Sequence, residues 1–231
     1  MATTPTRNAT DWLADALLDL APGQRVFATD IPWAVYTRLA DLRDERRPGV
    51  KITFDRGRIE FVSPRFRHER LSFWLRMIVL TLAEEFNLEL ISAGATTFRP
   101  EEGEQGLEAH ESFYVAHAQD VMGVDDIDLT VHPPPDLVIE VDLTSSSVPK
   151  ELMYGPMGVP ELWRHDDDEV AIRRLQPNGK YQTAPRSLAF PLVTAADLTR
   201  LLVEGRDEGE IAFVRRCRTW AKTLVTPPAQ P

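Results

Sequence analysis

Cysteine is nearly absent from this chain of 231 residues, and the single example is Cys217. One cysteine cannot form a disulfide within the chain, which fits a reducing compartment. It also excludes a zinc site built from several cysteine ligands. We interpret Cys217 as a packed helix residue rather than a nucleophile.

Long apolar runs are also missing. No stretch approaches the roughly 20 consecutive apolar residues that a membrane-spanning helix requires. The first residues lack the charged segment followed by an apolar stretch that is typical of a secretion signal. The sequence therefore predicts a soluble, cytoplasmic protein with no membrane partner.

Three further motifs are absent: an internal repeat, a glycine-rich phosphate loop and a nucleophile elbow. The segment that begins at Gly94 is too short for a phosphate loop, and no helix is predicted after it. A metal-independent hydrolase using His and Ser stays open as a minor alternative, because such triads are recognised by geometry. The histidines available to it are His68, His110, His117, His132 and His165.

Basic residues are outnumbered, and the formal net charge is -10. This balance argues against a nonspecific grip on a polyanion, because Lys and Arg supply most of that affinity. The charge is segregated along the chain. Residues 43–76 hold ten Lys and Arg against five Asp and Glu, whereas residues 101–170 hold two against eighteen. A solvated charged surface and a pairing of metal-binding and phosphate-binding regions both explain this pattern.

The length fits one substantial domain. We predict a disordered tail over residues 1–10, a single domain over residues 11–224 and a disordered Pro-rich tail over residues 225–231. The patterns of apolar residues, turns and caps predict helices and strands in a non-alternating order, which indicates a mixed α/β fold. Predicted helices cover residues 10–20, 32–46, a long segment through 71–86, 195–202 and 209–224. Predicted strands cover residues 50–54, 58–62, 88–92, 95–99, 111–116, 137–142, 162–165, 170–175 and 181–182, and residues 101–106 form an acidic loop.

The most informative segment is the strand from Leu137 to Asp142, which carries two acids among apolar residues. Side chains alternate across a strand, so Glu140 and Asp142 face the same side. Acids on a buried strand are costly unless something binds them, and a pair of carboxylates suits Mg2+. The alternative is a partly exposed strand acid at Glu140 and a turn acid at Asp142. After this strand, Ser147 is a candidate cap for a helix that Gly155 and Pro156 should break early.

Several motifs together resemble a bacterial restriction endonuclease family, formerly a domain of unknown function and abundant in cyanobacteria, within the PD-(D/E)XK nuclease superfamily. The resemblance runs from about Val26 to Trp220. Each motif is weak alone and specific in combination. The motifs are Pro135-Asp136-Leu137-Val138-Ile139-Glu140-Val141, the turn Thr144-Ser145-Ser146-Ser147, Lys150, Gly158-Val159-Pro160-Glu161-Leu162-Trp163-Arg164, Val62-Ser63-Pro64, His68-Glu69, Gly94-Ala95-Thr96-Thr97, Gly106-Leu107-Glu108 and Glu111-Ser112-Phe113-Tyr114.

The resemblance implies a restriction-endonuclease-like core, with a central mixed sheet flanked by helices, and a metal-dependent endonuclease that hydrolyses DNA phosphodiester bonds. Mg2+, or Mn2+ in its place, is the implied cofactor. Glu140 corresponds to the family glutamate, Asp142 stands near the position of the superfamily lysine, and Lys150 is the candidate for a displaced lysine. These three residues are the predicted catalytic set. Glu69, beside His68, is a candidate carboxylate that faces the metal ion or supports one of its ligands.

One departure from the family pattern is serious, because His110 stands where relatives carry the first metal-binding Asp. Imidazole is a poor ligand for Mg2+ and a good one for transition metals. The predicted metal ligands are therefore His110, Glu140 and Asp142. Three outcomes stay open: an altered metal preference, rescue by Glu111 or Asp136, and a dead site. Rescue by Glu111 needs a bulge, since it faces the other side of its strand.

Predictions about partners follow from the same resemblance. DNA is the expected partner, with Arg65, Arg67 and Arg70 as candidate backbone contacts, although a solvated helix entrance explains these arginines equally simply. Asp136 is a candidate acid that supports a metal ligand or, as we favour, a strand-entry acid bound by local amides. A homodimer is a default expectation without residue support. The alternative function is a catalytically inactive nuclease fold that binds nucleic acid or protein.

Overall fold

The computed structural model describes residues 9–98, 104–142, 149–166 and 168–225. Their contacts group them into two compact units, each described here by itself. The first unit holds the described parts of residues 1–66, 97–108 and 147–149, and the second holds those of residues 67–96, 109–146 and 150–231. The prediction of a single domain over residues 11–224 stays a prediction, and most of the two predicted tails lies outside the described residues.

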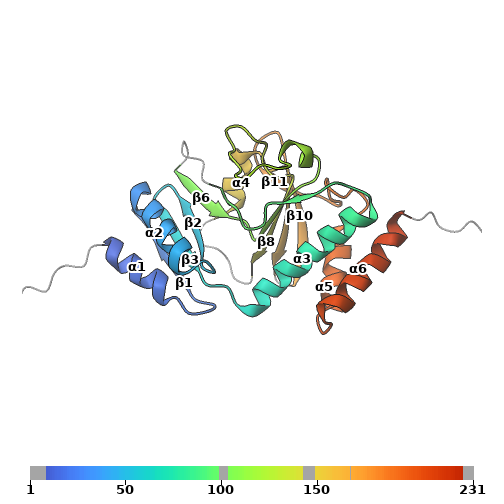
Figure 1. The fold of residues 1–231 in the computed structure, drawn as a ribbon, viewed down its shortest axis with the longest axis horizontal. Coiled ribbons are helices and arrows are strands. Elements are labelled where there is room, and N and C mark those ends of the chain that lie inside the picture. The colour runs from blue at the N-terminus through green and yellow to red at the C-terminus, as the bar shows by residue number, and fades with distance from the viewer. Residues whose placement is uncertain (1–8, 99–103, 143–148, 167, 226–231) are drawn as a thin grey trace, which may run out of the picture. The chain divides into compact units, whose positions relative to one another are not determined.

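The first unit is a five-stranded antiparallel sheet with two helices, α1 (Ala9–Asp19) and α2 (Trp33–Arg46) (Figure 1). Its strand order is β1-β3-β2-β6-β5. The core combines apolar side chains from both helices and the central strands, including Leu13, Leu39 and Phe54. The strands are β1 (Arg25–Ala28), β2 (Lys51–Asp55), β3 (Arg58–Val62), β5 (Thr97–Phe98) and β6 (Gln105–Glu108).

The hairpin predicted in this unit is confirmed. β2 and β3 pair from Asp55 opposite Arg58, and Arg56 and Gly57 between them both have positive φ. Such a two-residue turn matches the natural twist of paired strands. The acidic loop predicted over residues 101–106 is wrong at its end, because Gln105 begins β6, which pairs with β2 and β5. β1 was not predicted either.

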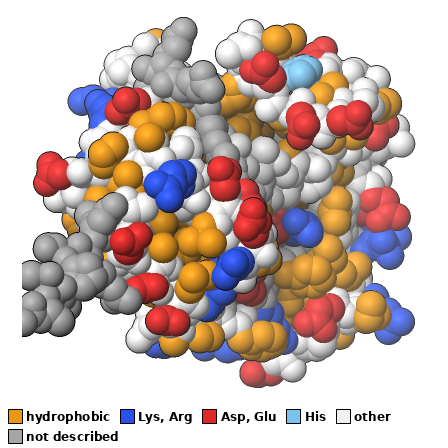
Figure 2. Space-filling model, turned by 60° about the vertical axis from the view of Figure 1, so that its left-hand side comes forward, with side chains coloured by type: hydrophobic (Ala, Val, Ile, Leu, Met, Phe, Trp, Pro, Cys, Tyr) orange, Lys and Arg blue, Asp and Glu red, His pale blue; other side chains and the backbone are white. Residues whose placement is uncertain are grey.

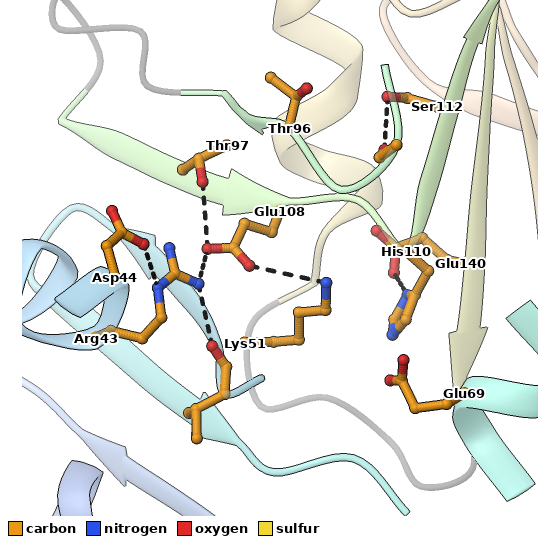
Figure 3. A network of polar contacts seen from close by, with 12 residues as sticks. Arg43, Asp44, Lys51, Glu69, Thr96, Thr97, Glu108, His110, Ser112 and Glu140 are labelled. Carbon is orange, nitrogen blue, oxygen red and sulfur yellow. Dashed lines mark hydrogen bonds and ion pairs between the residues drawn. The ribbon is translucent and has the colours of Figure 1, made fainter. Parts of the chain in front are cut away.

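The first unit also buries an ionic cluster around Glu108. Arg43 pairs with this carboxylate, Lys51 lies 3.9 Å from it, and the Thr97 hydroxyl donates to it over 3.2 Å (Figure 3). Two cations therefore compensate one buried acid, which explains how an acid at the end of β6 is tolerated in the interior.

The second unit contains a six-stranded sheet in the order β11-β10-β9-β8-β7-β4. Its described neighbours are antiparallel except β8 and β9, which run parallel, so the sheet is mixed. The strands are β4 (Ile91–Ser92), β7 (Glu111–Tyr114), β8 (Leu137–Asp142), β9 (Glu161–Asp166), β10 (Glu169–Leu175) and β11 (Tyr181–Thr183). The helices are α3 (Phe66–Glu85), α4 (Glu151–Met157), α5 (Ala195–Glu204) and α6 (Glu210–Val225), with a short 3-10 turn, η2 (Ala118–Asp120).

One side of this sheet is covered by α3, α5 and α6, whose apolar residues share a core with Leu137, Ile139 and Val141 of β8 (Figure 1). Trp74 of α3 stacks on Phe213 of α6 with ring centroids 4.7 Å apart. The inward alternation of β8 predicted from the sequence is confirmed. Glu140, pointing to the opposite side, is thereby separated from the large apolar core.

The long helix and its end agree with the sequence pattern. α3 ends at Glu85, and Asn87 adopts φ 52°, a left-handed conformation that Asn tolerates better than most residues. Aromatic side chains that lie at helix or strand spacing in the sequence are buried or packed against a core: Trp74, Phe98, Phe113 and Trp163 are buried, and Phe86 and Trp220 are partly buried.

The predicted mixed α/β class is confirmed by six α-helices and two sheets among the described residues. No helix of the described residues is both long and apolar enough to cross a membrane. On the face shown in Figure 2, Lys and Arg side chains lie scattered among acidic and apolar ones rather than in one continuous basic area.

Candidate functional site

β7 and β8 bring His110 and Glu140 together. Glu111 pairs with Ile139 in the antiparallel ladder, so the residue before β7 lies beside Glu140. The Nδ1 atom of His110 is 2.6 Å from Oε2 of Glu140, and both side chains are buried (Figure 3). The position at which the resemblance predicts the first metal-binding acid therefore holds an imidazole that is hydrogen-bonded to Glu140.

α4 delivers two more groups to the same carboxylate. Nζ of Lys150 lies 2.7 Å from Oε2 of Glu140, and the hydroxyl of Tyr154 donates to Oε1. Lys150 and Tyr154 are four residues apart, a spacing that places both on one side of a helix. The helix ends at Met157, one residue after Pro156, in line with the predicted early break, and Gly158 follows with a left-handed φ of 79°. The structure thus brings Lys150 to Glu140, as proposed for a displaced lysine.

The charges of this cluster follow from its surroundings. Burial raises the pKa of Glu140, but Lys150 and His110 outweigh it and hold that pKa at about 2. Burial lowers the pKa of His110 to about 4, against the attraction of Glu140 and with help from Lys150 and His68. Burial and Glu140 raise the pKa of Tyr154 well above 10. At neutral pH the cluster holds an ionised carboxylate, a neutral imidazole and a protonated phenol.

The tautomer of His110 follows from these charges. An ionised carboxylate only accepts hydrogen bonds, so Nδ1 carries the hydrogen in the contact with Glu140. The amide of Val141, 3.3 Å from the same nitrogen, favours the other tautomer, but the shorter charge-assisted contact is the stronger one. Nε2 of the neutral ring therefore carries a lone pair that can accept a proton or bind a metal ion.

The first turns of α3 lie against this imidazole. The rings of His68 and His110 have centroids 4.4 Å apart. Figure 3 shows the carboxylate of Glu69 directed toward the His110 ring. Nδ1 of His68 is 3.6 Å from Oε1 of Glu69, which is beyond hydrogen-bonding length. The predicted neighbour pair His68 and Glu69 thus lies beside the site.

Asp142 shares the β8 side with Glu140 but has a different partner. Nε of Arg164, on β9, donates to Oδ2 of Asp142 over 2.9 Å. The same guanidinium lies 3.3 Å from Asp166 and 3.8 Å from Glu151. Burial, then the charge of Glu140, raises the pKa of Asp142, although Lys150 and Arg164 oppose this rise. Asp142 therefore has Arg164 as its partner, and its use with Glu140 as a metal ligand stays a prediction.

The residues present restrict which metal ion suits this site. Among the described residues, no group of three or more His, Cys, Asp or Glu side chains is arranged to hold a metal ion. Both oxygens of Glu140 accept hydrogen bonds or ion pairs from protein donors. The oxygen-rich shell that Mg2+ favours is not assembled, whereas a carboxylate-bound imidazole with a free Nε2 is a common transition-metal ligand. The donor set fits a divalent transition ion better than Mg2+.

Comparison with known proteins identifies the family. A family model described as "Uma2: Putative restriction endonuclease" matches residues 33–204. The chain belongs to the Uma2 family. No curated protein matches the chain. The matched range contains Glu140, His110, Lys150 and Tyr154, so the whole cluster around Glu140 lies within the region that matches the Uma2 family.

The two acids considered as replacements for a metal-binding Asp at position 110 have other partners. Asp136 accepts backbone N–H bonds from Val115 and His117 at 2.7 and 3.0 Å, and its other oxygen lies 2.6 Å from Nδ1 of His117. These hydrogen bonds agree with the interpretation of Asp136 as a strand-entry acid bound by local amides. Glu111 is buried and bonded to Nε of Arg76 over 2.8 Å.

The three candidate DNA-contacting arginines lie in different settings. Arg65 is exposed and belongs to the first unit. Arg67 pairs with Asp168, while Arg70 donates to the carbonyl of Glu208 over 2.6 Å and lies over the Trp74 ring at 4.3 Å. The serine turn at residues 144–147, with the predicted cap Ser147, lies outside the described residues.

Sequence reasoning missed Tyr154 and Arg164. Tyr154 carries a detectable signal, because it follows Lys150 by one helical turn. Arg164 is opposite Glu140 in the parallel ladder, a pairing that no spacing within the sequence reveals.

Proposed function

We propose that this Uma2 protein is a nuclease that hydrolyses DNA phosphodiester bonds at the cluster around Glu140. The observation that supports the proposal most is the convergence of His110, Lys150 and Tyr154, from two separate segments, on one ionised carboxylate. Buried ionisable groups with strongly shifted pKa values are typical of reactive sites. Membership of a family described as a restriction endonuclease supplies the substrate class.

In this proposal the protein groups have distinct tasks. The ammonium of Lys150 binds a phosphate oxygen and offsets the charge that develops there. Glu140 fixes the His110 ring through Nδ1, so that the lone pair of Nε2 is left for the cation proposed below, and the attacking water gives up its proton to solvent. The water oxygen forms a bond to phosphorus as the bond to the leaving oxygen breaks, and that oxygen takes a proton from solvent. Tyr154 holds the carboxylate in place by donating to Oε1.

We further propose a divalent cation at the site, with Mn2+ supporting activity better than Mg2+. Nε2 of His110 and the carboxylate of Glu69 would hold it, and Glu140 would orient the imidazole as a carboxylate partner does in metal–histidine sites. When bound, such an ion polarises the phosphate and lowers the pKa of its water. Asp142, with Arg164 as its partner, is proposed to stabilise β8 and β9 rather than to bind the ion.

The test is cleavage of supercoiled and single-stranded DNA with Mg2+ and Mn2+ by the wild type and by Glu140→Gln. Glu169→Gln, an equivalent change at an exposed strand residue, is the matched control. We expect metal-dependent nicking that Glu140→Gln abolishes and Glu169→Gln preserves. Circular dichroism of each variant separates loss of chemistry from loss of folding. Nicking that persists in folded Glu140→Gln would contradict the proposal.

A catalytically inactive binding module is the second candidate function. It is supported by the occupation of Glu140 by internal donors and by the replacement of the family Asp with His110. The variant His110→Asp separates the two. Activity that appears only in His110→Asp would indicate a decayed site, whereas DNA binding without cleavage in all variants would indicate a binding role.

A further inference from the structure

A second polar cluster lies on the other side of the six-stranded sheet from Glu140. Side chains alternate along β9, so Arg164 shares the side of Asp142, and His165 points to the side that α3 covers. There α3, β9, the turn after it and the end of α5 enclose a pocket of about 60 Å3. The polar residues of its lining are Arg67, Arg70, Trp74, His165, Asp168 and Arg206.

The lining carries three guanidinium groups and one carboxylate. Arg67 pairs with Oδ1 of Asp168, and Arg206 lies 3.3 Å from the same oxygen. Arg70 uses a neutral backbone carbonyl, that of Glu208, as its partner. One acid therefore faces three cations in the lining, and the excess positive charge favours an anion. Arginine is the residue best suited to bind phosphate through two parallel N–H bonds.

Two buried ring nitrogens in the lining are unsatisfied. Nε1 of Trp74 and Nδ1 of His165 are buried and have no hydrogen-bond partner among the described residues. The indole N–H is a donor only, and leaving a buried donor unpaired is unfavourable. Burial lowers the pKa of His165, against the pull of Asp168, so its ring is neutral and can also donate one N–H. A ligand with several acceptor oxygens would satisfy both rings.

We propose that this pocket binds one phosphate group. Its volume suits a few water-sized groups, the size of a tetrahedral oxyanion, and is too small for a nucleoside. Arg67, Arg70 and Arg206 neutralise the charge, and Trp74 and His165 donate to oxygens that the arginines leave open. Asp168 competes with the ligand for Arg67 and Arg206. The site stands apart from the proposed hydrolysis at Glu140, since binding here needs no cleavage.

The first test is a calorimetric titration of the full-length protein with inorganic phosphate at constant ionic strength. The wild type should bind phosphate saturably. Arg67→Gln and Arg206→Gln should each weaken binding at least tenfold, whereas Arg200→Gln, an exposed arginine of α5 outside the pocket, should not change it. Asp168→Asn should strengthen binding, because it releases two guanidinium groups. A purely structural ion cluster would show no saturable binding, and this result would overturn the proposal.

Trp74→Phe tests the indole donor, because it keeps an aromatic ring against Phe213 while it removes the N–H together with part of the ring. We expect it to weaken phosphate binding severalfold while far-UV circular dichroism stays unchanged. If Trp74→Phe, Arg67→Gln and Arg206→Gln all bind phosphate with the affinity of the wild type, the proposal is contradicted.

Binding of three ligands shows which kind of phosphate group the pocket takes. The ligands are inorganic phosphate, an oligonucleotide with a 5′-phosphate and the same oligonucleotide with a 5′-hydroxyl. Binding of the 5′-phosphate form over the 5′-hydroxyl form through the same arginines indicates a terminal phosphate. Equal binding of both oligonucleotides indicates the diester backbone, and binding of inorganic phosphate alone indicates a free anion. Binding that is insensitive to Arg67→Gln in every case would place the ligand elsewhere and overturn the proposal.

Discussion

Two buried glutamates on neighbouring strands, Glu140 on β8 and Glu161 on β9, have opposite surroundings. Glu161 is fully buried, and among the residues that the structure describes its hydrogen-bond donors are all neutral: the Trp163 indole, the Ser187 hydroxyl and the amides of Leu188 and Ala189. Burial raises the pKa of Glu161, whereas Lys150 and His110 bring that of Glu140 down to about 2. Burial alone therefore does not mark a reactive acid; ionisable partners that can exchange with a substrate do.

The largest expected difference between the two acids is in catalysis. Glu140→Gln should reduce DNA cleavage by at least about 100-fold, as the loss of an electrostatic group in a reacting site does. Glu161→Gln should lower the free energy of unfolding by about 1–3 kcal/mol, because its amide places donors against donors. It should leave the activity of the folded fraction near that of the wild type. Paired measurements of nicking rate and urea unfolding check both expectations.

The reverse result would contradict the different roles expected for Glu140 and Glu161. If Glu161→Gln abolishes cleavage while remaining folded, or Glu140→Gln only destabilises, the surroundings of the two carboxylates do not predict their roles.

The metal preference gives the next largest effect. Mn2+ should raise the melting temperature of the wild type more than Mg2+ at equal concentration, because imidazole is a better ligand for transition ions. His110→Gln should abolish the Mn2+ effect, and His110→Asp should shift the preference toward Mg2+. Differential scanning fluorimetry measures these shifts without any DNA. An unchanged Mn2+ shift in His110→Gln would mean that the ion binds elsewhere.

Acid sensitivity sharpens the comparison further. The folded protein holds His110 neutral down to a pKa of about 4, whereas the ordinary value is 6.5. Between pH 4 and pH 6.5 the unfolded chain binds more protons at His110 than the folded protein does. The free energy of unfolding is therefore undiminished by His110 above pH 6.5 and decreases as the pH falls toward 4. The loss should be about 1.4 kcal/mol or less for each pH unit in this window.

Urea unfolding at several pH values between 7 and 4 measures this slope. His110→Gln should flatten it, and His132→Gln, on another loop, should leave it unchanged. Equal slopes in the wild type and His110→Gln would show that His110 is protonated as readily in the folded protein as in the unfolded chain.

The smallest effect is expected at Tyr154. Tyr154→Phe removes one donor to Glu140 and keeps the packing of the ring, so we expect a loss of about 1 kcal/mol in stability and a fewfold loss in nicking rate. The same change at Tyr181, whose hydroxyl donates to the carbonyl of Val159, should cost similar stability without the loss in rate. A matching loss in rate in Tyr181→Phe would assign the Tyr154 effect to general destabilisation.

Much of the fold was predictable where the local pattern is strong. The period of α3, the turn at Gly57 and the alternation of β8 each determine local structure directly. β6 has no such pattern: Leu107 is its one large apolar residue, and Gln105 and Glu108 are buried because β2 and β5 pair with this strand and Arg43 compensates Glu108. Such tertiary pairing cannot be read from local propensity.

The candidate site was predictable in part for the same reason. The neighbours within one element, such as Glu140 and Asp142 on β8, follow from the strand period. The approach of Lys150 to Glu140 depends on where α4 lies against β8, and the partner of Asp142 depends on the parallel pairing with β9. A shared strand side therefore predicted proximity of two acids but not their separate partners.

The most direct test of the central claim is nuclear magnetic resonance of the His110 imidazole at pH 7, with and without substoichiometric Mn2+. A neutral ring with its hydrogen on Nδ1, and preferential broadening of its Nε2 signal by Mn2+, would agree with a metal-facing histidine oriented by Glu140. A charged ring, a hydrogen on Nε2 or a signal unaffected by Mn2+ would contradict the account.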